Sequence, residues 1–157
     1  MAEKLSLSDR ADITDLLARY CYYIDEGEAD AWLDLWLEDG AFAGLTPQPL
    51  RGRAQLAGLP VRSLSTGSRH LLANIVADYG ATKDTIIVRC YNFVTSWLGG
   101  ARFNSMAIAR YELVRVSDSW KIKSNSVRRM MPSESDPAMF PEGFAYPADQ
   151  PTKFPPA

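Results

Sequence analysis

The chain has 157 residues, of which 46% are hydrophobic and 23% charged, and its balance fits one globular domain rather than a disordered chain. Its 17 basic and 19 acidic residues are dispersed and give a formal net charge of −2, so we expect no nucleic-acid partner. No apolar run approaches the roughly 18 residues of a membrane span, and the first residues lack the apolar core of a signal peptide, which predicts a cytoplasmic protein without a membrane partner.

The first predicted element is an amphipathic helix. Apolar side chains recur at spacings of three and four residues through Ile13–Ile24, as on one face of a helix. Ser6 or Ser8 is placed to cap its start, and Asp9 completes a capping box with Ser6. Gly27 is expected to end it, as a glycine after the last helical turn does.

A second helix is predicted directly after this glycine, ending at Gly40. Its buried stripe is expected to consist of Trp32, Leu33 and Trp36. Residues 46–67 are rich in Pro, Gly, Arg and Ser, which predicts a connection with one short helix near Ala54–Gly58.

From Ser68 onward the period of the pattern changes to two, which is typical of strands. Four strands are expected, at 69–79, Thr85–Trp97, Phe103–Val116 and Trp120–Met130. Gly99-Gly100 has the spacing of a two-residue hairpin, and Asp118-Ser119 makes the next turn. Helices first and an antiparallel meander second predict an α+β domain.

One predicted strand carries apolar side chains on both faces. Tyr91, Phe93 and Trp97 alternate on one side, while the other side can face the core. A second buried contact is therefore expected, and we predict a homo-oligomer, a dimer or trimer, formed through the outer face of the sheet.

The C-terminal segment differs in composition from the rest. Residues 132–157 hold seven of the ten prolines, which excludes a helix or a central strand. A disordered tail is one interpretation. The segment also carries Phe140, Phe144, Tyr146 and Phe154, which a solvated tail does not need. We therefore favour a domain over 1–131 and a tail that packs over a pocket or a neighbouring subunit.

Chemistry in this chain has to come from ordinary side chains. Cys21 and Cys90 lie far apart within apolar patterns, which indicates buried free thiols rather than a disulfide. With a single histidine, no metal site and no cofactor are expected. His70 and Asn74 fall on the same face of the first strand. A lone histidine is more often structural than catalytic, so the interpretation depends on its neighbours.

Three segments of the sequence together resemble those of a known family. The first helix carries Tyr20-x-x-x-x-Asp25, a Trp-containing segment follows, and Ser-Arg-His70-x-x-x-Asn74 opens the strands. This pattern, over about residues 8–130, resembles the SnoaL-like branch of the NTF2-like superfamily, which includes scytalone dehydratase, bile-acid 7α-dehydratase and hexachlorocyclohexane dehydrochlorinase. The resemblance implies helices packed on a strongly curved, mostly antiparallel sheet that encloses an apolar pocket.

The resemblance also implies a site. Asp25 and His70 would form an acid–base pair, with Tyr20 as a third catalytic residue. The predicted substrate-binding residues are Tyr23, Trp36, Asn74, Asn125 and Arg128. Two departures stand out: the second histidine of scytalone dehydratase has no counterpart, and the last-strand arginine of the dehydrochlorinase is replaced by Asn125, with Arg128 three residues on.

These residues predict a cofactor-independent lyase acting on a hydrophobic, ring-containing small molecule. Neutral imidazole can take a proton near neutral pH, and a carboxylate on its other nitrogen fixes the tautomer. A dehydratase-type elimination is favoured, while isomerisation or retro-aldol cleavage could use the same pair. The alternatives are a non-catalytic NTF2-like binding protein and a subunit like the β subunits of ring-hydroxylating dioxygenases.

Overall fold

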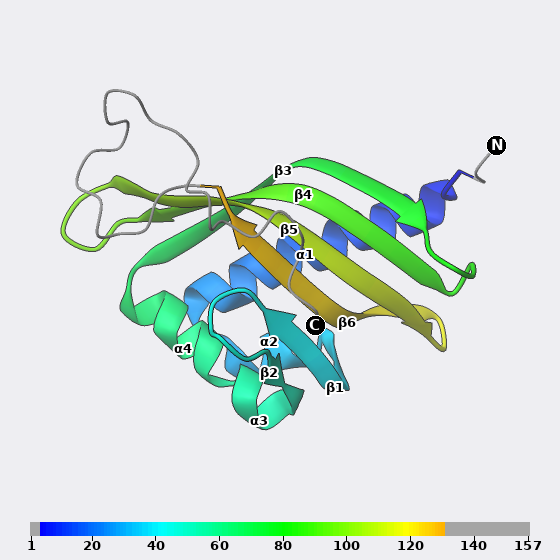
Figure 1. Ribbon diagram of the computed structural model, residues 1–157, viewed down its shortest axis with the longest axis horizontal. Coiled ribbons are helices and arrows are strands. Elements are labelled where there is room, and N and C mark those ends of the chain that lie inside the picture. Colours follow the sequence, from blue (N-terminus) through cyan, green and yellow to red (C-terminus); the bar gives the residue numbers. More distant parts are fainter. Residues whose placement is uncertain (1–3, 131–157) are drawn as a thin grey trace.

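The computed structural model describes residues 4–130, and Figure 1 shows how their elements are arranged. Its helices are α1 (Leu7–Glu26), α2 (Ala29–Leu33), α3 (Gly52–Leu56) and α4 (Gly58–Ser65). Its strands are β1 (Trp36–Ala43), β2 (Leu50–Arg51), β3 (Ser68–Tyr79), β4 (Thr85–Ser96), β5 (Arg102–Val116) and β6 (Ser119–Arg129). The tail predicted over 132–157 lies outside the described residues.

The described strands form one sheet in the order β2-β1-β6-β5-β4-β3. All neighbouring pairs are antiparallel except β1 and β6. The helices cover one face of this curved sheet, with α1 running along the long strands (Figure 1). Leu17 of α1 belongs to the same buried core as Val88 and Leu113 of the sheet. The predicted α+β fold, with helices packed on a mostly antiparallel sheet, is confirmed.

Helix α1 has the two ends that the sequence predicts. The Asp9 backbone N–H donates to Ser6 Oγ at 3.0 Å, and the Ser6 hydroxyl donates to Asp9 Oδ2 at 2.8 Å. Gly27 ends the helix with φ +72°, a left-handed conformation that a side chain would strain. A Cβ at this position would also lie 2.7 Å from Leu64 Cδ2 of α4. The last turn of α1, which carries Asp25, is therefore held close to α4.

The second helix predicted from the sequence is wrong beyond Leu33. Helix α2 stops there, and Trp36–Ala43 forms strand β1 instead of continuing the helix to Gly40. The stripe through Trp36 fits helical spacing, but the segment pairs in parallel with β6 and antiparallel with β2. Pairing with distant strands thus overrides the local helical pattern.

Residues 46–67 contain more helix than the sequence predicts. The single short helix expected near Ala54–Gly58 is replaced by two consecutive helices, α3 and α4. Each contributes an apolar anchor to the core, since Leu56 is fully buried and Leu59 is 9% exposed. Helix α4 contacts both α1 and strand β3, so it lies beside the end of α1 that carries Asp25 (Figure 1).

Strand β3 contains an irregularity that its sequence pattern hides. Its register with β4 shifts between Ala73 and Val76, and Asn74 in between has φ +53°. Such a β-bulge places one extra residue in the strand and changes which side chains face inward. Leu72 before the bulge and Tyr79 after it both pack on the core, although they are an odd number of residues apart.

The hairpin between β4 and β5 is wider than predicted. Ser96 pairs with Arg102, so the connection spans residues 97–101 rather than Gly99-Gly100 alone. On β4, Tyr91 and Phe93 alternate with the buried Cys90 and Asn92 and so face away from the helices. Their predicted role in self-association stays a prediction.

Candidate active site

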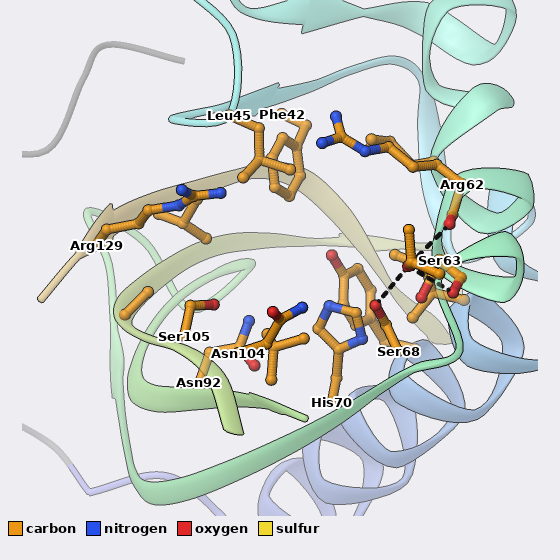
Figure 2. Close-up of a pocket in the computed structure, with 17 residues that line it drawn as sticks. Phe42, Leu45, Arg62, Ser63, Ser68, His70, Asn92, Asn104, Ser105 and Arg129 are labelled. Carbon is orange, nitrogen blue, oxygen red and sulfur yellow. Dashed lines mark hydrogen bonds between the residues drawn. The ribbon is translucent and has the colours of Figure 1, made fainter. Parts of the chain in front are cut away.

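A cavity of about 160 Å³ lies between the helices and the inner face of the sheet. Figure 2 shows how its side chains converge from α1, α4 and the strands. They are Tyr20, Ile24, Phe42, Leu45, Leu59, Arg62, Ser63, Thr66, Ser68, His70, Asn92, Val94, Asn104, Ser105, Ala107, Val127 and Arg129. The wall is more polar than expected, because hydroxyl, amide and guanidinium groups share it with the apolar side chains.

Asp25 and His70 are in contact beside this cavity, and their role as an acid–base pair stays a prediction. Asp25 Oδ1 lies 2.6 Å from His70 Nδ1, and Asp25 Oδ2 accepts the backbone N–H of His70 at 2.7 Å. The two bonds orient both the imidazole ring and the strand that carries it. Asp25 is 4% exposed, whereas His70 lines the cavity. Because the carboxylate occupies Nδ1, Nε2 is the ring nitrogen left for a ligand.

Two further side chains hold Asp25 in place. The Ser63 hydroxyl of α4 donates to Asp25 Oδ1 at 3.2 Å. Arg69 Nη1 donates to the backbone carbonyl of Asp25 at 3.1 Å, and its Nη2 lies 3.1 Å from Glu26 Oε1. A cation at the C-terminal turn of a helix is favourable, since the free carbonyls carry partial negative charge. Arg69 thereby fastens the end of α1 to β3, next to His70.

Tyr20 lies five residues before Asp25 on α1 and also lines the cavity. Its hydroxyl oxygen accepts a hydrogen bond from Asn125 Nδ2 at 3.2 Å. Burial raises the pKa of Tyr20 well above its usual range, so the phenol keeps its proton. With the oxygen already accepting from Asn125, the O–H is available to donate to a bound molecule. The structure thus brings together Tyr20 and Asn125, which the sequence predicts as separate site residues.

Trp36 and Tyr23 do not line the cavity. Trp36 is 4% exposed, and its ring centroid lies 6.2 Å from that of Tyr20 and 5.0 Å from that of Trp32. It therefore belongs to the core behind Tyr20. Tyr23 precedes Asp25 by two residues, which is about 200° around a helix and so nearly the opposite side. Its hydroxyl accepts from Arg19 Nη1 at 3.1 Å on the exposed surface.

Asn74 and Arg128 are also placed away from the cavity. Asn74 is exposed at the bulge of β3, where the alternation that predicted it beside His70 is broken. Arg128 is three residues after Asn125, and side chains three apart on a strand face opposite sides. It is paired with Ile108, while Arg129 is paired with the cavity residue Ala107. Arg129, not Arg128, is the arginine of the cavity.

Several cavity residues were not among those predicted from the sequence. Arg129 could have been predicted from the sequence, because it is four residues after Asn125 and so lies on the same face of the strand. Asn92 could have been predicted as well, since it is a polar residue on the inner face of an apolar strand and is only 8% exposed. Arg62 could not, because its helix lies in a segment that the composition predicts as a connection.

The cysteines take no part in this site. Cys21 and Cys90 are free thiols, as predicted, and burial raises the pKa of each to about 12. Among residues 4–130 there is no group of three or more His, Cys, Asp or Glu side chains arranged to hold a metal. Within the same range, no helix is long and apolar enough to cross a membrane.

Solved structures share this architecture. An NTF2-like protein with a cystatin-like fold from Novosphingobium aromaticivorans is 27% identical, with a TM-score of 0.70 over 85% of this chain and 87% of the other. Aln2 from a Streptomyces species is 19% identical, with a TM-score of 0.71 over 81% and 94%. ActVI-ORFA from Streptomyces coelicolor is 15% identical, with a TM-score of 0.68 over 78% and 98%. The last two show the fold alone.

No curated protein matches the chain significantly. The model of the SnoaL-like domain, however, matches residues 5–125, a span that includes the first helix, the aspartate–histidine contact and the strand with Asn125. The fold, the cavity and this match agree, and the chain belongs to the SnoaL-like family of NTF2-like proteins.

Proposed function

We propose that this protein is a cofactor-independent lyase that removes water from a cyclic small molecule, with His70 as the base and acid. The observation that carries the proposal is the 2.6 Å contact between Asp25 Oδ1 and His70 Nδ1 beside a cavity that His70 lines. A histidine held in this way has one fixed tautomer and one free nitrogen aimed at a ligand.

The elimination needs one proton carrier. Nε2 of neutral His70 takes a proton from a substrate carbon, and the electron pair of that C–H bond becomes the new C=C bond. The C–O bond on the neighbouring carbon breaks, and the imidazolium returns its proton to the departing hydroxide as water. Asp25 stabilises the imidazolium while it exists. A single histidine is sufficient, because the same ring takes and returns the proton.

The other polar groups suit the oxygen atoms of such a substrate. Tyr20 can donate its O–H to an oxygen that gains negative charge, and its raised pKa means that it stays protonated while doing so. Asn125 acts through Tyr20 as a positioning residue. Asn92 Oδ1 is buried without a hydrogen-bond partner in the described part of the chain, and it can accept from a substrate hydroxyl in the cavity.

The test uses a panel of cyclic ketones that carry a hydroxyl β to the carbonyl, because dehydration gives a conjugated product that absorbs in the ultraviolet. Wild type should release water from at least one member. The His70→Ala variant should remain folded by circular dichroism and lose about 10²–10⁴-fold in kcat, the range that a positioned general base supplies. Turnover that survives in His70→Ala would leave the binding-protein interpretation as the better one.

A further inference from the structure

The cavity differs in charge from the chain as a whole. The protein has a formal net charge of −2, yet among residues 4–130 no Asp or Glu lines the cavity. Two arginines do: Arg62 from helix α4 and Arg129 at the end of β6. The Asp25 carboxylate is hydrogen-bonded to His70, a lining residue, and is not itself part of the wall. A ligand in this cavity therefore meets positive charge.

The two guanidinium groups face the same space. In Figure 2, Arg62 and Arg129 reach toward each other from opposite sides, on either side of Phe42 and Leu45, and His70 lies across the cavity from them. Within residues 4–130 neither arginine forms an ion pair, whereas Arg69 and Arg115 are paired with carboxylates. Two unpaired guanidinium groups that converge are suited to a planar acidic group, which each can bind through parallel hydrogen bonds.

The volume of the cavity limits the rest of the ligand. Its volume is about 160 Å³, close to that of an engineered cavity of about 150 Å³ in another protein that binds benzene. One six-membered ring fills such a space. Apolar side chains of the same wall, among them Phe42 and Val127, are available to contact that ring.

We propose that the ligand of this site is a single-ring carboxylic acid, with its carboxylate between Arg62 and Arg129 and its ring between them and His70. That such an acid is the substrate rests on the proposed lyase function. The preference for binding a single-ring acid can be measured without any turnover. Arg129 is half-buried and Arg62 is exposed. Arg129 therefore contributes more to binding, since its hydrogen bonds are less screened by water.

The test is calorimetric titration with benzoate and with benzamide, which has nearly the same shape and no charge. Wild type should bind benzoate at least about tenfold more tightly than benzamide, the difference expected for charge-assisted hydrogen bonds. Arg129→Gln should remove most of this preference and Arg62→Gln a smaller part. Arg89→Gln serves as the matched control, because Arg89 is exposed and pairs with Asp78 outside the cavity. Raising the salt concentration should weaken benzoate alone.

Equal affinity for benzoate and benzamide, no benzoate binding at millimolar concentration, or unchanged benzoate affinity in both cavity variants would each overturn the proposal. 1-Naphthoate tests the single ring: it should bind more weakly than benzoate, and tighter binding would overturn that part. If benzoate binds through Arg129 but no compound shows turnover that depends on His70, only the lyase proposal fails. If a neutral compound is turned over by His70 with no preference for acids, only this inference fails.

Discussion

Helix α1 carries a buried aspartate near each end, and the two have different surroundings. Asp9, in the first turn, is 5% exposed, and Asp25, in the last turn, is 4% exposed. Asp9 accepts hydrogen bonds from four side chains: Ser6, Tyr79, Arg115 and Trp120. None of these five residues lines the cavity. The Asp9 cluster, defined by these five, joins the start of the helix to the sheet and lies outside the cavity.

Asp25 has fewer partners, and one of them reaches a cavity. It accepts from the backbone and ring of His70 and from Ser63, both of which line the cavity. Burial and hydrogen bonding alone therefore do not distinguish a functional carboxylate from a structural one. The difference lies in whether the partner has an unused polar atom that a ligand can contact. We therefore expect an Asp→Asn substitution to have opposite effects at the two sites, on turnover at Asp25 and on stability at Asp9.

Of the substitutions that compare the two aspartates, Asp25→Asn should have the largest effect on turnover of a substrate found with the panel above. The amide can still hold the ring of His70, but it cannot stabilise the imidazolium and favours the wrong tautomer. We expect kcat to fall by about 10²–10³-fold, less than for His70→Ala, and the melting temperature to change little. Turnover near that of wild type would mean that the contact between Asp25 and His70 is structural, like the Asp9 cluster.

Asp9→Asn should do the reverse. The substitution leaves the Arg115 guanidinium beside an amide, and Arg115 also stacks on Trp120, with its Cζ 4.3 Å from the ring centroid. We expect the free energy of unfolding to drop by about 2–3 kcal/mol, at the lower end for a broken buried pair because Arg115 remains partly exposed to water. Chemical denaturation measures the loss. Turnover per folded molecule should be unchanged, and a large fall in kcat would contradict the division between the two sites.

A smaller effect on turnover is expected from Tyr20→Phe, with Tyr111→Phe as its matched control. The two rings are in edge-to-face contact with centroids 5.5 Å apart, but only Tyr20 lines the cavity. Losing one of several hydrogen bonds to the developing oxyanion should raise the barrier by about 1–3 kcal/mol. The Tyr111 hydroxyl is buried beside Asn125 and does not line the cavity, so its removal should leave kcat nearly unchanged. Equal losses in both variants would assign Tyr20 to packing.

The sequence predicts the parts of the site that depend on local pattern. Helical spacing places Tyr20 inside the buried face and Asp25 at its edge, and the resemblance to SnoaL-like proteins pairs Asp25 with His70. These predictions are correct in geometry because one helix and the first residues of one strand carry them. The N-cap at Ser6, which accepts the Asp9 backbone N–H, is correct for the same reason.

Other features depend on contacts that no local pattern encodes. Trp36 reads as helical but pairs with distant β6, and the bulge at Asn74 turns that side chain out of the site. The choice between Arg128 and Arg129 follows from strand alternation once Asn125 is known to face inward. The wider role of Asp9 could not be predicted, because its partners Arg115 and Trp120 are more than a hundred residues away in sequence.

The smallest expected effect is on the pH dependence of stability. It separates the contribution of the Asp9 charge from that of its hydrogen-bond geometry. Burial alone would raise the pKa of Asp9, but its hydrogen bonds outweigh burial and lower the pKa to about 2. A carboxylate whose pKa is lower in the folded than in the unfolded chain stabilises the fold above the unfolded value, near 4, and this stabilisation is lost as the pH falls toward 2. The amount is about 2 kcal/mol at most.

The measurement is the free energy of unfolding of wild type and Asp9→Asn across this range. Both proteins share every other carboxylate, so acid destabilises both, and only the difference between them reports Asp9. That difference should be largest above pH 4 and should shrink as the pH falls toward 2, because protonation of Asp9 makes the wild type resemble the amide. A difference that stays constant over the whole range would mean that the Asp9 cluster depends on hydrogen-bond geometry and not on the charge of the carboxylate.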